Sequence, residues 1–568
     1  MSGRKLTFLL ITIPIVALFF CFNTLPLIKG VIYSFTNFKG YGSYDWVGLR
    51  NYKDLFTDSR VGGSYLFTFK LAIVATIVTN VLSLILALGL NSKIRFKSAL
   101  RGAYFIPNVL GALVVGYIFN YFFTYILPAF GKMVGNKTLS SSMLSSTSLA
   151  WVAIVIVCAW QSIAMNTIIY ISGLQTVPED VYEAGAIDGA TGFSKFRYLT
   201  FPLIVPFFSI NMVLCVKNFL MVFDQIMALT KGGPAQSTES ISYLIYNNGM
   251  SGGQFGFQSA NAVIFFIVIV IISAVQFDYH REKGGAAVMK TKVREKANWP
   301  VTILLILGLI TVVFPLYMTI VIAFKQPTEM TNSVAGILSL PEKFSLANFR
   351  EAMEVTDFWH SLGNSVLITV ITVVLAIVIH SLLGYAIARN KRSKFYKFIY
   401  LYVVSGMFVP FAILMMPLVK QTAEMGLDNK VGVIILYTVF YMPMNVLLYS
   451  GYLTNIPMAL EEAACVDGAS TWKTYWKIIF PIMKPMHATV AVLTALGTWN
   501  DVMTPLVIMS GSTGGTTLPL AQLNFQTQFG TNYNLAFASY LLALLPILLF
   551  YLICQKHILN GVVNGAVK

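Results

Sequence analysis

Long, continuous apolar runs dominate this chain of 568 residues. A bilayer core about 30 Å thick needs roughly 20 apolar residues in a helix, because each residue rises about 1.5 Å. Runs of that length predict membrane-spanning helices, and their continuity argues against the alternating strands of a membrane barrel. The twelve runs are 7–28, 67–90, 102–127, 150–172, 203–229 and 259–278, followed by 300–324, 362–388, 398–419, 431–451, 485–510 and 537–554.

Composition supports an integral membrane protein that is embedded in the lipid bilayer. Hydrophobic residues make up 57% of the chain and charged residues only 11%, with a mean hydropathy of +0.72. Soluble domains carry about a quarter charged residues, so a soluble enzyme, a nucleic-acid binder and a disordered chain are disfavoured. The first run is too long for a signal peptide and lacks a small-residue cleavage site, so we expect it to be retained.

Basic residues indicate the orientation of the spans. If the N-terminus is inside, 24 of the 39 Lys and Arg residues fall in inside segments. The sharpest clusters, at 91–101 (NSKIRFKSALR) and 388–397 (ARNKRSKFYK), each follow the second span of a set of six. The positive-inside rule therefore predicts an even number of spans in each half and both termini in the cytoplasm.

One stretch occurs twice. Residues 178–206 (PEDVYEAGAIDGATGFSKFRYLTFPLIVP) align without gaps with 457–485 (PMALEEAACVDGASTWKTYWKIIFPIMKP), with 9 identities in 29 positions. Each copy follows the fourth span of its half, on the side expected to be cytoplasmic. Six spans restore the same orientation, so the sequence predicts an all-α protein of about 12 transmembrane helices, arranged as two parallel six-helix repeats.

The domain boundaries follow from this repeat. We expect a first half at 1–279, a cytoplasmic linker at 280–299 and a second half at 300–568. The linker is polar and basic and contains Gly and Ala residues. Met289 precedes Lys-Thr-Lys and a new apolar run, so it resembles the start of a second polypeptide. Whether nature or an experimenter joined the two halves stays open.

The repeated stretches, which we call the first elbow (178–206) and the second elbow (457–485), predict a short helix, a turn and a second amphipathic helix. Pro178 and the acids that follow it suit a helix N-terminus, and Gly189 suits the end of that helix. The acids of one such elbow could simply be solvated on a helix that caps the bundle. Two elbows in matching places favour a docking surface for a two-fold partner.

The E-A-A, D-G-A and Phe-Pro pattern of the elbows resembles the coupling-loop signature of ABC importer permeases that work with a binding protein. The stretches 46–56 (WVGLRNYKDLF) and 228–246 (ALTKGGPAQSTESISYLIY) resemble the first permease of maltose-type carbohydrate importers. The stretches 497–509 (GTWNDVMTPLVIM) and 516–525 (TTLPLAQLNF) resemble the second permease. The resemblance covers nearly the whole chain and implies the type I ABC importer permease fold, with both permease subunits fused.

The resemblance also implies a function: import of a sugar or oligosaccharide across the bacterial cytoplasmic membrane by ATP-driven alternating access. Two cytoplasmic ABC ATPase subunits, which use ATP and Mg, would grip the elbows, and an extracellular or periplasmic solute-binding protein would deliver the carbohydrate. Residues 128–149 are short where some maltose permeases insert a large outer domain, so the details of binding-protein docking stay open. The residues that match the coupling pattern are Glu183, Ala184, Asp188, Gly189, Glu462, Ala463, Asp467 and Gly468.

We expect a transport subunit and not an enzyme. The sequence contains no G-x-x-x-x-G-K-[ST] segment, and so lacks the loop that cradles nucleotide phosphates. It also shows no metal-ligand spacing. We therefore expect no catalytic residue, no metal, no bound cofactor and no nucleic-acid partner on this chain, with ATP hydrolysis on a separate subunit.

A sugar site needs planar hydrogen-bonding groups and an aromatic face. By the resemblance, Trp160 and Asn108 match positions of sugar-contacting residues, although the family's asparagine pattern is not reproduced and a different sugar is expected. For Gln161 and Ser162, interhelical hydrogen bonding is an equal alternative. The predicted substrate-binding residues are Asn108, Trp160, Gln161, Ser162, Asn218, Asp224 and Gln225.

Ionisable residues inside the spans permit an alternative function. A charge near the membrane centre costs about 2.5–3.5 kcal/mol on insertion scales. We therefore expect Lys217 and Asp224 either to pair with neighbouring helices or to line a water-filled cavity. Because they are seven positions apart, we expect them on one helix face. With His380 they could serve a secondary sugar transporter driven by an ion gradient, although a lone His is more often a packing residue. Asn500 and Asp501 predict an unwound, cavity-facing segment.

Overall fold

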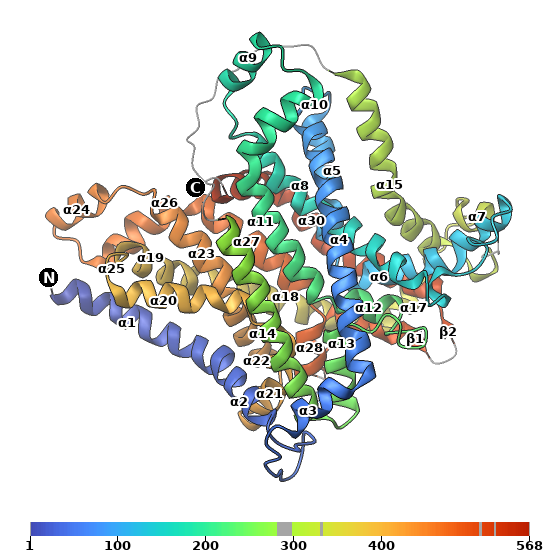
Figure 1. Cartoon of the computed structure of the whole chain (residues 1–568), viewed down its shortest axis with the longest axis horizontal. Coiled ribbons are helices and arrows are strands. Elements are labelled where there is room, and N and C mark those ends of the chain that lie inside the picture. The colour runs from blue at the N-terminus through green and yellow to red at the C-terminus, as the bar shows by residue number, and fades with distance from the viewer. Residues whose placement is uncertain (1, 281–297, 330–332, 510–513, 528–529, 567–568) are drawn as a thin grey trace.

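A computed structural model describes residues 2–280, 298–329, 333–509, 514–527 and 530–566 (Figure 1). The predicted linker and Met289 therefore fall almost entirely outside the described residues. The first-half helices are α1 (Ser2–Phe19), α2 (Leu25–Tyr33), α3 (Arg50–Thr57), α4 (Ser59–Asn91), α5 (Lys97–Val109), α6 (Ala112–Tyr121), α7 (Leu127–Met133), α8 (Ala150–Leu174), α9 (Glu179–Ile187), α10 (Gly192–Lys195), α11 (Phe201–Leu220), α12 (Asp224–Leu229), α13 (Ile241–Tyr246) and α14 (Phe255–His280).

The second half repeats this order of long and short helices. They are α15 (Trp299–Phe324), α16 (Val334–Leu338), α17 (Ala347–Val355), α18 (Phe358–Leu375), α19 (Ser381–Arg389), α20 (Lys394–Ser405), α21 (Phe411–Glu424), α22 (Lys430–Phe440), α23 (Met442–Leu453), α24 (Ala459–Val466), α25 (Thr471–Thr474), α26 (Phe480–Ile482), α27 (Lys484–Asn500), α28 (Met503–Ile508), α29 (Leu518–Ala521) and α30 (Tyr533–Ala566). In the described part of the chain the strands β1 (Gln526–Thr527) and β2 (Gly530–Thr531) have two residues each, so the predicted all-α fold is confirmed.

The predicted spans correspond to apolar helices of sufficient length. Within the described residues, nine helices can cross a membrane, and up to twelve spans result if three bent helix pairs each count as one. The bent pairs are Lys394–Phe408 with Phe411–Glu424 at 99°, Lys430–Phe440 with Met442–Leu453 at 44°, and Thr471–Ile482 with Lys484–Asn500 at 75°. Each of these pairs overlaps one predicted apolar run, which agrees with six spans in each half. The predicted run 102–127 is divided between α5 and α6, and the span there is Ala112–Met133.

The first helices of both halves reach across to the other half. The Gln421 amide in α21 donates a hydrogen bond of 2.9 Å to the Cys21 carbonyl oxygen in the first span. In the opposite sense, the Tyr104 hydroxyl in α5 donates a hydrogen bond of 2.7 Å to the Leu305 carbonyl oxygen in α15. The two repeats therefore share one bundle and do not lie side by side as separate bodies.

The fifth span of each half is broken before it ends. In the first half α11 ends at Leu220 and α12 begins at Asp224, and in the second half α27 ends at Asn500 and α28 begins at Met503. The interruption expected at Asn500 is confirmed. The expectation that Lys217 and Asp224 share one helix face is wrong, because the helix ends between them.

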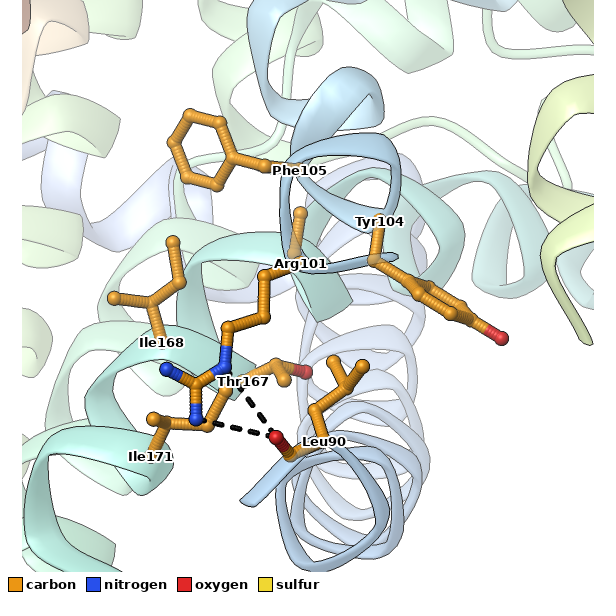
Figure 2. A pocket seen from close by; sticks show the side chains of 8 residues that line it. Leu90, Arg101, Tyr104, Phe105, Thr167, Ile168 and Ile171 are labelled. Atoms are coloured by element: carbon orange, nitrogen blue, oxygen red, sulfur yellow. Dashed lines mark hydrogen bonds between the residues drawn. The ribbon is translucent and has the colours of Figure 1, made fainter. Parts of the chain in front are cut away.

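Basic residues after α4 cap the end of that helix. Lys97 Nζ donates hydrogen bonds to the carbonyl oxygens of Asn91 at 2.7 Å and Ser92 at 3.2 Å. Figure 2 shows Arg101 reaching the Leu90 carbonyl oxygen, with Nε at 3.3 Å and Nη2 at 3.1 Å. Cations are favoured where helix carbonyls lack partners. Partial burial, with the nearby Arg101 charge, lowers the pKa of Lys97 to about 8.

A second pair of matching elements lies on the opposite side of the molecule from the elbows. Short helices α3 and α17 each carry a buried asparagine, Asn51 and Asn348, in similar sequences (LRNYKD and LANFRE). Each side-chain amide donates two hydrogen bonds to backbone carbonyls at or just beyond the end of the first long helix of its half. The acceptors are Ser34 and Thr36 at 2.8 Å each for Asn51, and Ala323 at 2.9 Å and Lys325 at 2.7 Å for Asn348.

Candidate functional site

Both elbows form the helix–turn–helix that the sequence predicts. α9 and α10 build the first elbow, and α24 and α25 build the second. In Figure 1, α9 at the top and α24 at the left project from the bundle, whereas α3 and the two strands lie across the molecule from them. Gly189 and Gly468 both have φ of 77° at the turn, a conformation that glycine adopts without steric cost.

The elbow residues singled out from the sequence are exposed. Glu183, Ala184 and Asp188 are exposed in the first elbow, as are Glu462, Ala463 and Asp467 in the second. Two apolar residues at matching positions, Ile187 and Val466, are 89% and 88% exposed. Bulky aromatic residues, Phe193 and Trp472, also match and are 72% and 49% exposed. Each elbow thus presents an apolar and acidic surface of the kind that marks an interaction site.

A cavity of about 710 Å³ lies between the two halves, next to the breaks in their fifth spans. That volume is in the range of small-molecule sites. Its wall is mainly apolar, with polar groups from both halves. The polar lining residues are Asn23, Lys217, Asn218, Asp224, Gln225, Ser242, Tyr437, Tyr441, Asn445, Asp501 and Thr504.

Each half contributes one carboxylate to this wall. Asp501 accepts hydrogen bonds from the Tyr437 hydroxyl at 2.8 Å and the Thr504 backbone N–H at 3.1 Å. Asp224 accepts no hydrogen bond from the residues that the structure describes. The first break is held open by Ser240, whose hydroxyl donates a hydrogen bond of 2.9 Å to the Val222 carbonyl oxygen. Asp224 therefore lines the cavity with carboxyl oxygens that accept no hydrogen bond from the described residues and could accept one from a ligand.

The residues predicted for substrate binding divide into two groups. Asn218, Asp224 and Gln225 line the cavity. Gln161 lies behind the wall, where its Oε1 accepts a hydrogen bond of 2.9 Å from Gln225 Nε2 and its own Nε2 donates one of 2.9 Å to the Leu110 carbonyl oxygen.

The other predicted residues lie away from the cavity lining. The Trp160 ring packs edge-on against Phe119, with centroids 5.2 Å apart, and its buried indole N–H has no partner in the described chain. Asn108 and Ser162 are partly buried on α5 and α8 and are not among the lining residues. The aromatic residues that line the cavity are instead Phe223, Phe411, Tyr437, Phe440 and Tyr441, none of which was predicted from the sequence.

A second cavity of about 570 Å³ continues toward the elbow side. Its lining includes Lys391 and Lys397 of the second basic cluster. It shares five mainly apolar lining residues with the first cavity: Met165, Leu214, Met407, Met444 and Leu493. We call the first cavity the chamber and the second the inner vestibule; these five apolar side chains lie where the two adjoin.

His380 serves the packing of the second half. Its Nε2 lies 2.8 Å from the Thr438 carbonyl oxygen, and its Nδ1 lies 3.1 Å from Asn445 Nδ2. The ring is fully buried, with both nitrogens engaged. This arrangement is the packing role expected of a lone His. Among the described residues, no group of three His, Cys, Asp or Glu side chains could hold a metal ion.

Each half of the chain separately resembles known proteins. The family of binding-protein-dependent transport system inner membrane components matches residues 79–283 and again 380–563. MsmF of Streptococcus mutans, a multiple sugar-binding transport system permease protein, is 40% identical over 271 residues, which is 48% of this chain and 92% of MsmF. MsmG, the permease protein of the same name and organism, is 39% identical over 284 residues, which is 49% of this chain and 100% of MsmG.

A solved structure of a bacterial alginate ABC transporter, in complex with an alginate pentasaccharide-bound periplasmic protein, is 19% identical. The likeness has a TM-score of 0.43 and covers 49% of this chain and 94% of that one. Each matched region of the family contains one elbow and one broken fifth span. The chain therefore belongs to the family of binding-protein-dependent transport system inner membrane components, and it carries two copies of the family domain in one multi-pass membrane polypeptide.

Proposed function

We propose that this chain carries an uncharged sugar or oligosaccharide inward across the bacterial cytoplasmic membrane. The observation that supports this most is the chamber between the halves, where carboxylate, amide and phenol groups converge beside apolar and aromatic walls. Sugar hydroxyls donate to and accept from such groups, and sugar rings pack on aromatic faces. The MsmF and MsmG relatives are multiple-sugar permease proteins, which agrees with this choice of substrate.

The ionisable groups that line the chamber favour an uncharged substrate over an anionic one. Asp224 and Asp501 place two carboxylates on its wall, and Lys217 supplies one ammonium group. Carboxylates make strong hydrogen bonds to hydroxyl groups and repel anionic ligands at close range. An uncharged sugar therefore suits the chamber better than an acidic one.

The power source is proposed to be a pair of cytoplasmic ABC ATPase subunits, which bind and hydrolyse ATP with Mg. They would dock on the elbows, with Glu183 and Glu462 as polar contacts and Ile187 and Val466 as apolar contacts. Closure of the ATPases would bring the elbows together and alternate access to the chamber by a rigid-body movement. This orientation puts both chain termini in the cytoplasm.

The opposite face is proposed to receive a solute-binding protein. The matching helices α3 and α17 are preceded by exposed apolar residues, Leu49 at 68% and Leu346 at 70%. Trp46 and Phe344 beside them are 66% and 74% exposed. A two-lobed protein could contact one helix with each lobe and release its sugar between them.

Reconstitution tests the proposal. The chain, co-purified with its ATPase and placed in proteoliposomes with the binding protein outside, should take up radiolabelled sucrose, raffinose or maltotriose only when ATP is inside. Digalacturonate, an acidic disaccharide, should not be taken up. Uptake driven by a proton or sodium gradient without ATP would contradict the proposal and favour a secondary transporter.

A further inference from the structure

The second elbow is joined to the bundle by a buried ion pair. Arg389 Nε lies 2.5 Å from Glu461 Oε1, and the two side chains are only 4% and 3% exposed. The Tyr385 hydroxyl donates a hydrogen bond of 3.0 Å to the other carboxylate oxygen of Glu461. Arg389 Nη1 also donates a hydrogen bond of 2.9 Å to the carbonyl oxygen of Leu453, the last residue of α23. One charged cluster thus connects α24 of the elbow with α19 and α23.

A second polar contact joins the elbow to the other end of α19. The hydroxyl groups of Ser381 and Tyr475 lie 2.6 Å apart, and the Tyr475 ring packs against Tyr385 with centroids 5.0 Å apart. Ser381 is the first residue of α19 and Arg389 is the last. The elbow therefore holds α19 at both ends, so that a displacement of the elbow must carry this helix along.

Helix α19 is packed tightly against the helix that lines the chamber. A Cβ atom at Gly384 would lie 2.7 Å from Tyr449 Cβ, so α19 and α23 approach more closely at this point than a side chain would permit. The same helix α23 contributes Met444 and Asn445 to the chamber and Leu447 to the inner vestibule. A contiguous set of close contacts therefore runs from Glu461 to the cavity wall.

The first elbow has no equivalent connection at these positions. At the positions of Glu461 and Tyr475, it carries Tyr182 and Phe196. The polar contacts of Tyr182 stay inside the elbow: its hydroxyl accepts a hydrogen bond of 3.2 Å from Thr200, and Lys195 Nζ lies 4.4 Å from its ring centroid. The ring itself packs against a buried apolar cluster of the first half.

The helix that precedes the basic cluster also differs between the two halves. The helix before the basic cluster ends in Asn91 in the first half and in Arg389 in the second. In the first half, Lys97 and Arg101 donate hydrogen bonds to the last carbonyl oxygens of that helix. Figure 2 shows the contact that Arg101 makes.

We propose that the Arg389–Glu461 pair, with Tyr385, is the joint that transmits movement of the second elbow to the chamber, and that the first elbow, which packs on its half through apolar contacts, has no charged joint at the matching positions. These are positioning residues: they act through α19 and α23 and touch neither sugar nor nucleotide. The proposal rests on the proposed function, since it assumes that ATPases move the elbows. It differs from docking, because Glu461 is buried while its neighbour Glu462 is exposed.

The test uses the complex purified with its ATPase and follows movement at the vestibule. In a background without the five native cysteines, Leu447→Cys reports access to a water-soluble maleimide with and without ATP plus vanadate. We expect ATP plus vanadate to change the labelling rate by about fivefold or more, the size of an ordinary allosteric coupling. Glu461→Gln should abolish this change, while the ATPase still co-purifies and still hydrolyses ATP.

Matched variants separate coupling from folding. Tyr182→Phe, the counterpart in the first elbow, should leave the ATP response intact. Arg389→Met with Glu461→Leu should keep the packing but lose the response, because apolar replacements often preserve the stability of a buried pair. An unchanged response in both Glu461→Gln and this double variant would overturn the proposal, as would release of the ATPase by Glu461→Gln. No response in the parent complex would instead contradict the proposed function.

Discussion

Asn51 and Asn348 make equivalent hydrogen bonds in the two halves of the molecule. Each is buried at the start of a short helix, and each amide nitrogen donates two hydrogen bonds to carbonyl oxygens at or just beyond the end of the first long helix of its half. The last carbonyls of a helix lack partners within that helix, so an outside donor is needed there. Each asparagine therefore ties its short helix to the end of the first long helix of its half.

The first prediction concerns this pair. Asn51→Asp or Asn348→Asp keeps the shape of the side chain but removes the N–H donors and adds a charge beside carbonyl oxygens. We expect each change to lower stability by about 2 kcal/mol or more, because buried acceptors lose their partners. The apparent melting temperature in detergent should fall for both variants. Asn455→Asp, on an exposed position, is the control and should change it little.

The second prediction concerns the chamber. Asp224→Asn should weaken sugar binding by up to about tenfold, because one acceptor oxygen is replaced by a donor group and a hydrogen bond contributes about 0.5–1.5 kcal/mol. Uptake should fall mainly through a higher apparent KM, with the sugar-independent ATPase rate unchanged. Trp160→Phe is the comparison, since Trp160 packs on Phe119 and does not line the chamber. A larger loss of affinity for Trp160→Phe than for Asp224→Asn would contradict this prediction and indicate that Trp160 contacts the sugar.

The third prediction concerns pH. The pKa of Lys97 is about 8, below the usual 10.5, because the amine is partly buried and Arg101 is close. At pH 8 about half of this amine is neutral, so Lys97 should be acetylated faster than the exposed Lys93, as measured by peptide mass spectrometry. Between about pH 8 and 10.5 the unfolded chain binds more protons at this site than the folded chain, so this group adds stability as pH rises. Slower acetylation of Lys97 than of Lys93 would contradict the lowered pKa.

The long-range architecture could be predicted because the apolar runs are continuous and the elbows repeat without gaps. The break between α5 and α6, within the predicted run 102–127, was not predicted, because a hydrogen-bond partner of its backbone lies far away in the sequence. The carbonyl of Val109, at the end of α5, accepts a hydrogen bond of 2.9 Å from the Asn500 amide in the other half. Nothing in the apolar run 102–127 indicates that this distant partner exists.

The candidate site was only partly predictable for a similar reason. Tyr437, Tyr441 and Asn445 are spaced four apart in the apolar run 431–451, a spacing that predicts a polar stripe and could have indicated the cavity wall. The bend of 44° between α22 and α23, which falls among these residues, could not be read from that spacing. Glu461 and Glu462 are adjacent acids, and sequence cannot tell which is buried against Arg389. That distinction depends on how α24 is rotated on the bundle.

The central claim is that the exposed acids of the two elbows hold the ATPases. Co-purification of the ATPase with Glu183→Lys combined with Glu462→Lys tests it most directly. Asp54→Lys with Glu351→Lys is the matched control, because it makes the same charge change at exposed positions on the opposite side. We predict that the elbow variant loses the ATPase in detergent while the control retains it. Full retention of the ATPase by the elbow variant would contradict the claim.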